Sequence, residues 1–195
     1  MSRIAITGGI GSGKSYVSAL LEKRGIPIYN ADNESKRLTV QDEGIRKGLM
    51  DLLGEEVYCG GELNKPMLAS YLFASPENAA RINAIIHPRI KADFLRWACE
   101  HKDYKIVGIE SAILYESGFD DVVDGVVMVY APEKLRIERA MKRDGASETQ
   151  IRVRMAAQMD DEIKRQKADW VVMNDGSIPL DVQLGTLIEL LKKGK

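Results

Sequence analysis

A glycine-rich stretch with one lysine begins at residue 7 and reads TGGIGSGKS. Its spacing, Gly8-x-x-x-x-Gly13-Lys14-Ser15, is that of a phosphate-binding loop, or P-loop. Glycines let successive backbone N–H groups turn toward phosphate oxygens, Lys14 supplies charge for the β- and γ-phosphates, and the Ser15 hydroxyl suits Mg²⁺. A tight strand-to-helix turn with a chance lysine is the competing interpretation. We predict that ATP contacts Gly11, Ser12, Gly13, Lys14, Ser15 and Tyr16, with Ser15 on the metal.

Two acidic residues follow apolar segments and are further candidates for chemistry. Asp32 comes just after the segment 26–30, and a carboxylate past the carboxyl end of a strand faces the ligand crevice of an open α/β sheet. It is expected either to accept a proton from an attacking hydroxyl or to cap the following helix. Glu110 follows the segment 106–109 and is expected either to hold Mg²⁺ through water or to be a solvated acid at a strand end.

Three arginines, Arg136, Arg139 and Arg143, share one face of a predicted helix through their i, i+3, i+7 spacing. Such basic runs usually form solvated faces. Beside a phosphate-binding loop, however, a closing lid needs arginines to neutralise the transferring phosphoryl group. The charged region 143–167 is therefore a predicted helical lid.

The elements that must position these residues alternate between strand and helix. The segments predicted as strands are apolar without polar alternation, which is typical of strands buried on both faces of a parallel sheet. Helical patterns lie between them, for example at 14–24 and 132–143, so the sequence predicts a layered α/β fold. The predicted strands are residues 3–7, 26–30, 105–110, 125–130 and 169–173.

One interval of more than seventy residues between the second and third predicted strands interrupts this alternation. It shows little strand signal, and apolar residues recur at helical spacing within 67–73 and 76–101. We therefore expect a helical insertion at 32–102, and a nucleotide-binding core formed by 1–31 and 103–195.

Composition narrows the classes of function. The chain has 195 residues, with 28 basic and 29 acidic side chains giving a formal net charge of -1, which argues against a general nucleic-acid binder. Its two cysteines lie far apart and form no metal-binding pattern. No targeting segment and no apolar run long enough to span a membrane is present. We expect a cytoplasmic protein with small-molecule substrates, without nucleic acid, membrane or an obligate protein partner.

A set of short motifs is spread over nearly the whole chain. They are TGGIGSGKS, Ala31-Asp32, Ile86-His87-Pro88, Ser111–Glu116, Arg139 to Asp144, Arg154–Gln158, Ala168-Asp169 and Asn174-Asp175-Gly176. In this order and spacing, the motifs resemble the dephospho-CoA kinase family. The resemblance implies transfer of the ATP γ-phosphoryl group to the ribose 3′-hydroxyl of dephospho-CoA, giving coenzyme A and ADP. It also implies the three-layer P-loop NTPase fold, with a five-stranded parallel sheet, a helical CoA-binding insertion and a helical lid.

The resemblance also implies roles for single residues. Asp32 falls on the catalytic aspartate of the acceptor side, and Arg143 on the lid arginine that closes over the phosphoryl group. Arg139 and Asn174 fall beside the nucleotide, although an Asn-Asp-Gly turn is the plain alternative for Asn174. The residues expected to bind the acceptor are Asp32, Lys36, His87 and Leu114, with Lys14 sharing the catalytic role with Asp32 and Arg143.

Three positions depart from the family pattern. Asn30 stands where an aspartate is usual, Lys36 replaces an arginine and Ala112 replaces a proline. Lysine retains the charge but loses the planar fork of a guanidinium group. Two alternatives to this activity are a P-loop kinase acting on another small acceptor and a regulatory module that binds ATP without transferring phosphate.

Overall fold

The computed structural model describes residues 1–193, which divide into two compact units. Unit 1 comprises Met1–Asn30 together with the chain from Ala98 onward, and unit 2 comprises Ala31–Trp97. Unit 2 lies within the sequence of unit 1, as expected for an insertion between the second and third strands of a sheet.

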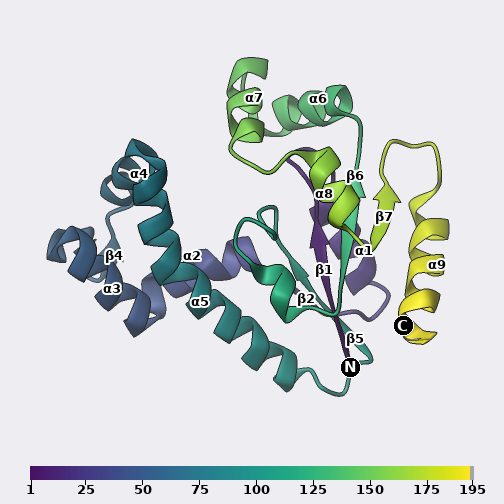
Figure 1. Ribbon diagram of the computed structural model, residues 1–195, viewed down its shortest axis with the longest axis horizontal. Helices are drawn as coiled ribbons and strands as arrows, with labels where there is room; N and C mark the ends of the chain where they lie inside the picture. Colours follow the sequence, from purple (N-terminus) through teal and green to yellow (C-terminus); the bar gives the residue numbers. More distant parts are fainter. Residues whose placement is uncertain (194–195) are drawn as a thin grey trace. The chain divides into compact units, whose positions relative to one another are not determined.

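Unit 1 contains the predicted five-stranded parallel sheet, which confirms the expected fold class (Figure 1). The strand order β2-β5-β1-β6-β7 places β1 at the centre. The other strands begin at most one residue from the predicted start, and the largest difference is at β2, which begins at Ile28 rather than at residue 26. The Ile26 N–H donates to the Leu21 carbonyl and completes the turn that ends the preceding helix. The strands are β1 (Ser2–Thr7), β2 (Ile28–Asn30), β5 (Ile106–Glu110), β6 (Gly125–Tyr130) and β7 (Trp170–Met173).

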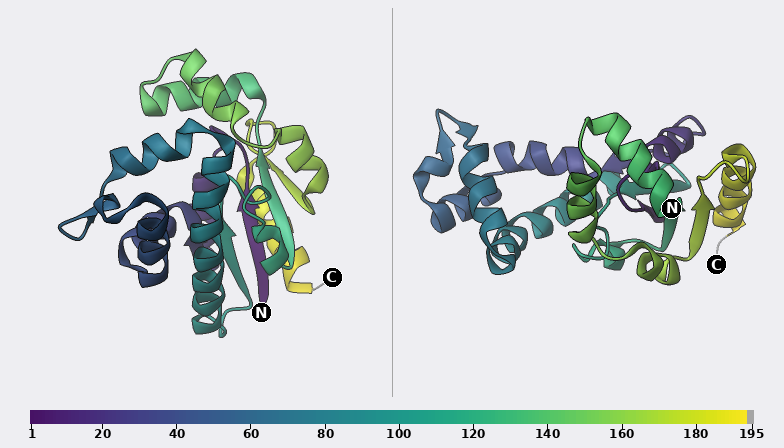
Figure 2. Two further views of the ribbon diagram at one scale, coloured as in Figure 1. Left: turned by 60° about the vertical axis from the view of Figure 1, so that its left-hand side comes forward. Right: turned by 90° about the horizontal axis from the view of Figure 1, so that it is seen from above.

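Helices α1 and α9 cover one face of this sheet. Alternate residues of the central strands, such as Ile4 and Ile6, pack with Val17 of α1 and Leu184 of α9 in one apolar core. The helices α6 and α7 lie at the carboxyl ends of β1 and β6 (Figures 1 and 2), where the phosphate-binding loop also begins. The helices of unit 1 are α1 (Lys14–Glu22), η2 (Phe119–Val122), α6 (Glu133–Asp144), α7 (Glu148–Ala156), α8 (Asp161–Lys167) and α9 (Leu180–Lys193).

Unit 2 is mainly helical, and Figure 2 shows its helices in blue and teal. The sequence did not predict its two-stranded antiparallel hairpin, because strands of two residues show no periodicity. The hairpin turns at Gly60-Gly61, both with positive φ. The elements are α2 (Ala31–Gln41), α3 (Glu43–Leu53), η1 (Glu55–Val57), β3 (Tyr58–Cys59), β4 (Glu62–Leu63), α4 (Lys65–Ala74) and α5 (Pro76–Glu100, which leaves the unit after Trp97).

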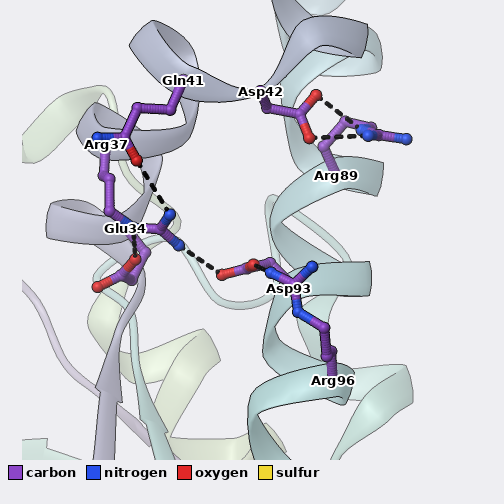
Figure 3. Close-up of polar contacts among 7 residues, drawn as sticks. All are labelled: Glu34, Arg37, Gln41, Asp42, Arg89, Asp93 and Arg96. Carbon is purple, nitrogen blue, oxygen red and sulfur yellow. Dashed lines mark hydrogen bonds and ion pairs between the residues drawn. The ribbon is translucent and has the colours of Figure 1, made fainter.

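Ion pairs hold α2 against α5 within unit 2 (Figure 3). Arg37 of α2 donates to Asp93 of α5 at 3.0 Å and to Glu34 at 2.5 Å, and Asp93 is buried and also pairs with Arg96. Arg37 is thus used in packing the unit. Arg37 and the neighbouring Lys36 are both exposed.

Asp42 joins the same elements at the start of α3. Its carboxylate caps the helix by accepting from the Ile45 N–H at 2.8 Å, and it accepts two hydrogen bonds from Arg89 at 2.9 and 2.7 Å. The hydrogen bonds from Arg89 hold the pKa of Asp42 below its usual value of 3.8, and the cap adds to this.

We expect Asp42→Ala to lower the free energy of unfolding by about 1 kcal/mol through loss of the cap, and Asp42→Asn, which keeps a capping oxygen, to lower it less. Because the pKa is depressed in the folded state, the charge stabilises the fold above the unfolded pKa and ceases to do so as the pH falls through the folded one. Urea unfolding of wild type and Asp42→Asn between about pH 7 and about pH 2 measures how this contribution to the free energy of unfolding changes with pH. A difference between wild type and Asp42→Asn that does not shrink below pH 3.8 contradicts the assignment. Asp51→Asn, on the exposed side of α3, is the control.

Within residues 1–193, the structure has no helix that is both long and apolar enough to cross a membrane.

Candidate active site

The glycine-rich loop joins β1 to α1, the context that its pattern predicts. Gly11 and Gly13 have φ values of 79° and 89°, which strain any residue with a side chain. A Cβ atom at Gly11 would also overlap the Arg136 carbonyl. Gly13 precedes Lys14, the first residue of α1, so the positive end of the helix dipole is directed at the loop. The backbone is therefore shaped and charged to bind an anion.

Asn174 and Arg139 meet at the end of this loop. The Asn174 side-chain amide donates to the Ser12 carbonyl at 2.7 Å, and Arg139 donates to the Asn174 carbonyl at 2.8 Å. A Cβ atom at Gly13 would collide with the Asn174 amide nitrogen. These two residues, which the sequence predicts to bind the nucleotide, are 35 positions apart in the chain, and the structure brings them together at the loop.

Ser15, Glu110 and Asn30 form a hydrogen-bonded group at the carboxyl ends of β2 and β5. The Ser15 hydroxyl donates to Glu110 Oε1 at 2.5 Å, and the Asn30 amide donates to Glu110 Oε2 at 3.3 Å. Asn30 thus leaves Glu110 as the one carboxylate of this group, where the usual aspartate would add a second. A hydroxyl and one carboxylate are hard oxygen donors of the kind that Mg²⁺ takes when ATP phosphates and water complete its shell. The residues present therefore fit a phosphate-bound Mg²⁺.

The remaining loop residues differ in exposure. Lys14 is half-buried at the start of α1, whereas Tyr16, two residues further along the first turn, is 61% exposed. Leu114, predicted to contact the acceptor, has a fully buried side chain. Its part in binding the acceptor stays a prediction.

Arg143 is paired within the lid region. It donates to both carboxylate oxygens of Asp144, at 2.7 and 3.1 Å, and Arg154 donates to the same carboxylate at 3.0 Å. These hydrogen bonds raise the pKa of Arg143 and hold that of Asp144 below its usual range. A transferring phosphoryl group would compete with Asp144 for both guanidinium groups.

Three predicted acceptor residues belong to unit 2. Asp32 is exposed and is the second residue of α2, inside the first turn of the helix. One interpretation of the sequence placed it before the helix as the capping residue, and its position in the structure does not agree with that interpretation. Lys36 is exposed one turn later on the same helix face. His87 is half-buried in α5, and burial lowers its pKa below 6.5, with Lys91 adding to the effect. His87 is therefore neutral at physiological pH.

Sequence reasoning missed a buried lysine that fixes α8. Lys164 is fully buried, and its Nζ donates to the Ala112 carbonyl at 2.8 Å and pairs with Glu116 at 3.2 Å. Glu116 also accepts from the Met159 N–H at 2.7 Å. Nothing in the sequence relates residues some fifty positions apart, and an exposed lysine is the usual expectation. The last part of the predicted lid, α8, is thus attached to the segment after β5.

Comparison with known proteins agrees with this geometry. The family model for dephospho-CoA kinase matches residues 2–179. Dephospho-CoA kinases from Bacteroides fragilis and Porphyromonas gingivalis are 56% and 42% identical over 97% and 98% of this chain and 92% and 95% of their own. A solved structure of a Thermus thermophilus protein is 34% identical, with a TM-score of 0.82 over 96% of each chain.

Proposed function

The chain belongs to the dephospho-CoA kinase family, and we propose that it transfers the γ-phosphoryl group of ATP to the ribose 3′-hydroxyl of dephospho-CoA through the residues described above. Family membership confirms the predicted enzyme class. It argues against the alternative that the chain is a regulatory module which binds ATP without transferring phosphate. The observation that carries the proposal is the phosphate-binding loop with Asn174, Arg139 and the Ser15–Glu110 pair gathered around it.

On the donor side, the loop N–H groups and Lys14 bind the ATP phosphates. Lys14 balances the negative charge that develops as the bond to the γ-phosphorus breaks. Arg139 and Asn174 fix the end of the loop and border the nucleotide. Ser15 and Glu110 would hold Mg²⁺, which when bound screens the phosphate charges.

On the acceptor side, Asp32 accepts the proton of the attacking hydroxyl or orients it for in-line attack. Its exposure on the first turn of α2 leaves the carboxylate accessible, and Lys36 supplies a positive charge for the acceptor one turn further along. His87, neutral at physiological pH, serves as a hydrogen-bonding group for the acceptor. Arg143 leaves Asp144 to meet the phosphoryl group as the lid closes.

A screen of acceptors tests the proposed reaction. With ATP and Mg²⁺, release of ADP is expected to depend on dephospho-CoA and to be absent with shikimate or with nucleoside monophosphates. Analysis of the product is expected to place the new phosphate on the ribose 3′ position. Equal turnover with one of the other alcohols, or ADP release that no acceptor stimulates, contradicts the proposal.

A second prediction concerns the metal. Glu110→Gln keeps the shape of the side chain but loses its charge, so the complex with ATP is expected to bind Mn²⁺, a spectroscopic substitute for Mg²⁺, about tenfold more weakly. Electron paramagnetic resonance measures free Mn²⁺, and the affinity for ATP without metal should stay unchanged. Glu22→Gln, exposed at the end of α1, is the matched control. Equal Mn²⁺ affinity in Glu110→Gln and wild type means that Glu110 does not face the metal.

A further inference from the structure

The outer side of the phosphate-binding loop contacts three side chains from the region after β6. The Ile10 N–H donates to the side-chain amide oxygen (Oε1) of Gln158 at 3.2 Å, and the Gly9 backbone lies against the Asp161 carboxylate. Arg136 lies 3.5 Å from the Ile10 carbonyl oxygen. These contacts fall on Gly9 and Ile10, just before the segment that is shaped to receive phosphate.

Arg136 of α6 and Asp161 of α8 form a buried ion pair at 2.9 Å, with 7% and 8% of the two residues exposed. Burial raises the pKa of the Asp161 carboxyl, and the positive charges of Arg136 and Lys164 oppose this effect only in part. The Arg136 Nε is buried without a hydrogen-bond partner among residues 1–193. A buried ion pair is poor evidence of stability, since packed apolar residues usually serve as well. Stability alone therefore does not explain the pair.

Gly9 shows what the pair does to the loop. Its φ is not among the positive values of the chain, so conformation does not demand a glycine there. A Cβ atom at Gly9 would instead lie 2.5 and 2.6 Å from the two Asp161 carboxylate oxygens and would strike the Arg136 guanidinium. The loop backbone thus packs directly against the ion pair, which leaves no room for a side chain at this position.

The elements that carry the pair are themselves anchored. Lys164 ties α8 to the Ala112 carbonyl, and the Arg136 carbonyl lies against Gly11 on the other side of the loop. A rigid support behind a binding loop lowers the cost of ordering that loop when a ligand binds.

We propose that Arg136 and Asp161 are positioning residues for phosphoryl transfer, which with Gln158 hold Gly9 and Ile10 in the shape that receives ATP. This inference rests on the proposed function for its effect on turnover, but its effect on ATP binding is independent of the acceptor. Arg136 and Asp161 act through the loop backbone and do not themselves touch the phosphates.

The test is a double variant, Arg136→Met with Asp161→Leu, which fills the space with apolar groups. Its thermal midpoint is expected to stay close to that of wild type, whereas Kd for ATP, measured by calorimetry without acceptor, rises about tenfold because the loop loses the hydrogen bond from Arg136 to the Ile10 carbonyl oxygen. The control is Arg152→Met with Glu148→Leu, an exposed ion pair of α7. A folded double variant that binds ATP as wild type does overturns the proposal.

Amide exchange in the wild-type protein provides a second measurement, and this measurement does not require the double variant to fold. Without ATP, the Ile10 amide is expected to exchange at least tenfold more slowly than in an unstructured peptide, because it donates a hydrogen bond to the Gln158 side chain. Gln158→Met, just after the end of α7, should remove this protection. An unprotected Ile10 amide in the wild-type protein overturns the proposal. A chain that binds ATP in the expected way but does not phosphorylate dephospho-CoA contradicts the proposed function and leaves the positioning role intact.

Discussion

Replacement of Lys14 by methionine is expected to lower kcat/KM by about 10²–10³, because the charge that stabilises the transferring phosphoryl group is lost while the shape of the side chain is largely kept. ATP should also bind more weakly, since the proposed role of Lys14 is to contact the phosphates before and during transfer. Steady-state kinetics and calorimetry measure the two effects separately.

Lys23→Met is the matched control for this variant, because Lys23 is an exposed lysine at the opposite end of the same helix. It should leave both quantities within about twofold of wild type, as surface substitutions usually do. Turnover of Lys14→Met close to the wild-type value would mean that the loop binds ATP without using this lysine in the transfer.

The second large effect is expected for Asp32→Asn. Loss of the base should lower kcat by about 10²–10⁴. Kd for ATP should not change, because the donor site is built from residues of unit 1. This split distinguishes a group that acts on the acceptor from one that shapes the nucleotide site.

Rapid-quench measurement of a single turnover shows whether the loss in Asp32→Asn lies in the chemical step. Asp51→Asn makes the same chemical change at an exposed position of unit 2 and should be without effect. An unchanged rate of transfer in Asp32→Asn would mean that Asp32 is not the base, and that catalysis depends on positioning and charge alone.

The residues predicted for the phosphate donor, ATP, and those predicted for the acceptor come from different kinds of information in the sequence. The phosphate-binding loop is local: its glycines, Lys14 and Ser15 are adjacent in the chain, and the apolar segment before them predicts the strand. Asp32 gains its role from the ordered family resemblance, because the residue alone fits a structural explanation equally well. The structure shows it inside the first turn of α2, which argues against a cap that precedes the helix, and its role as a base stays a prediction.

The sequence by itself determined the parallel sheet and the glycine-rich loop between strand and helix, because the patterns that indicate them lie in residues close together in the chain. Only the tertiary structure decided what surrounds the loop. The contact between Ile10 and Gln158 spans 148 positions and that between Ser15 and Glu110 spans 95. Such contacts depend on the strand order of the sheet, which no local pattern of residues specifies. Gly9 is the sharpest case, since its glycine is required by a buried ion pair whose members lie more than 120 residues away.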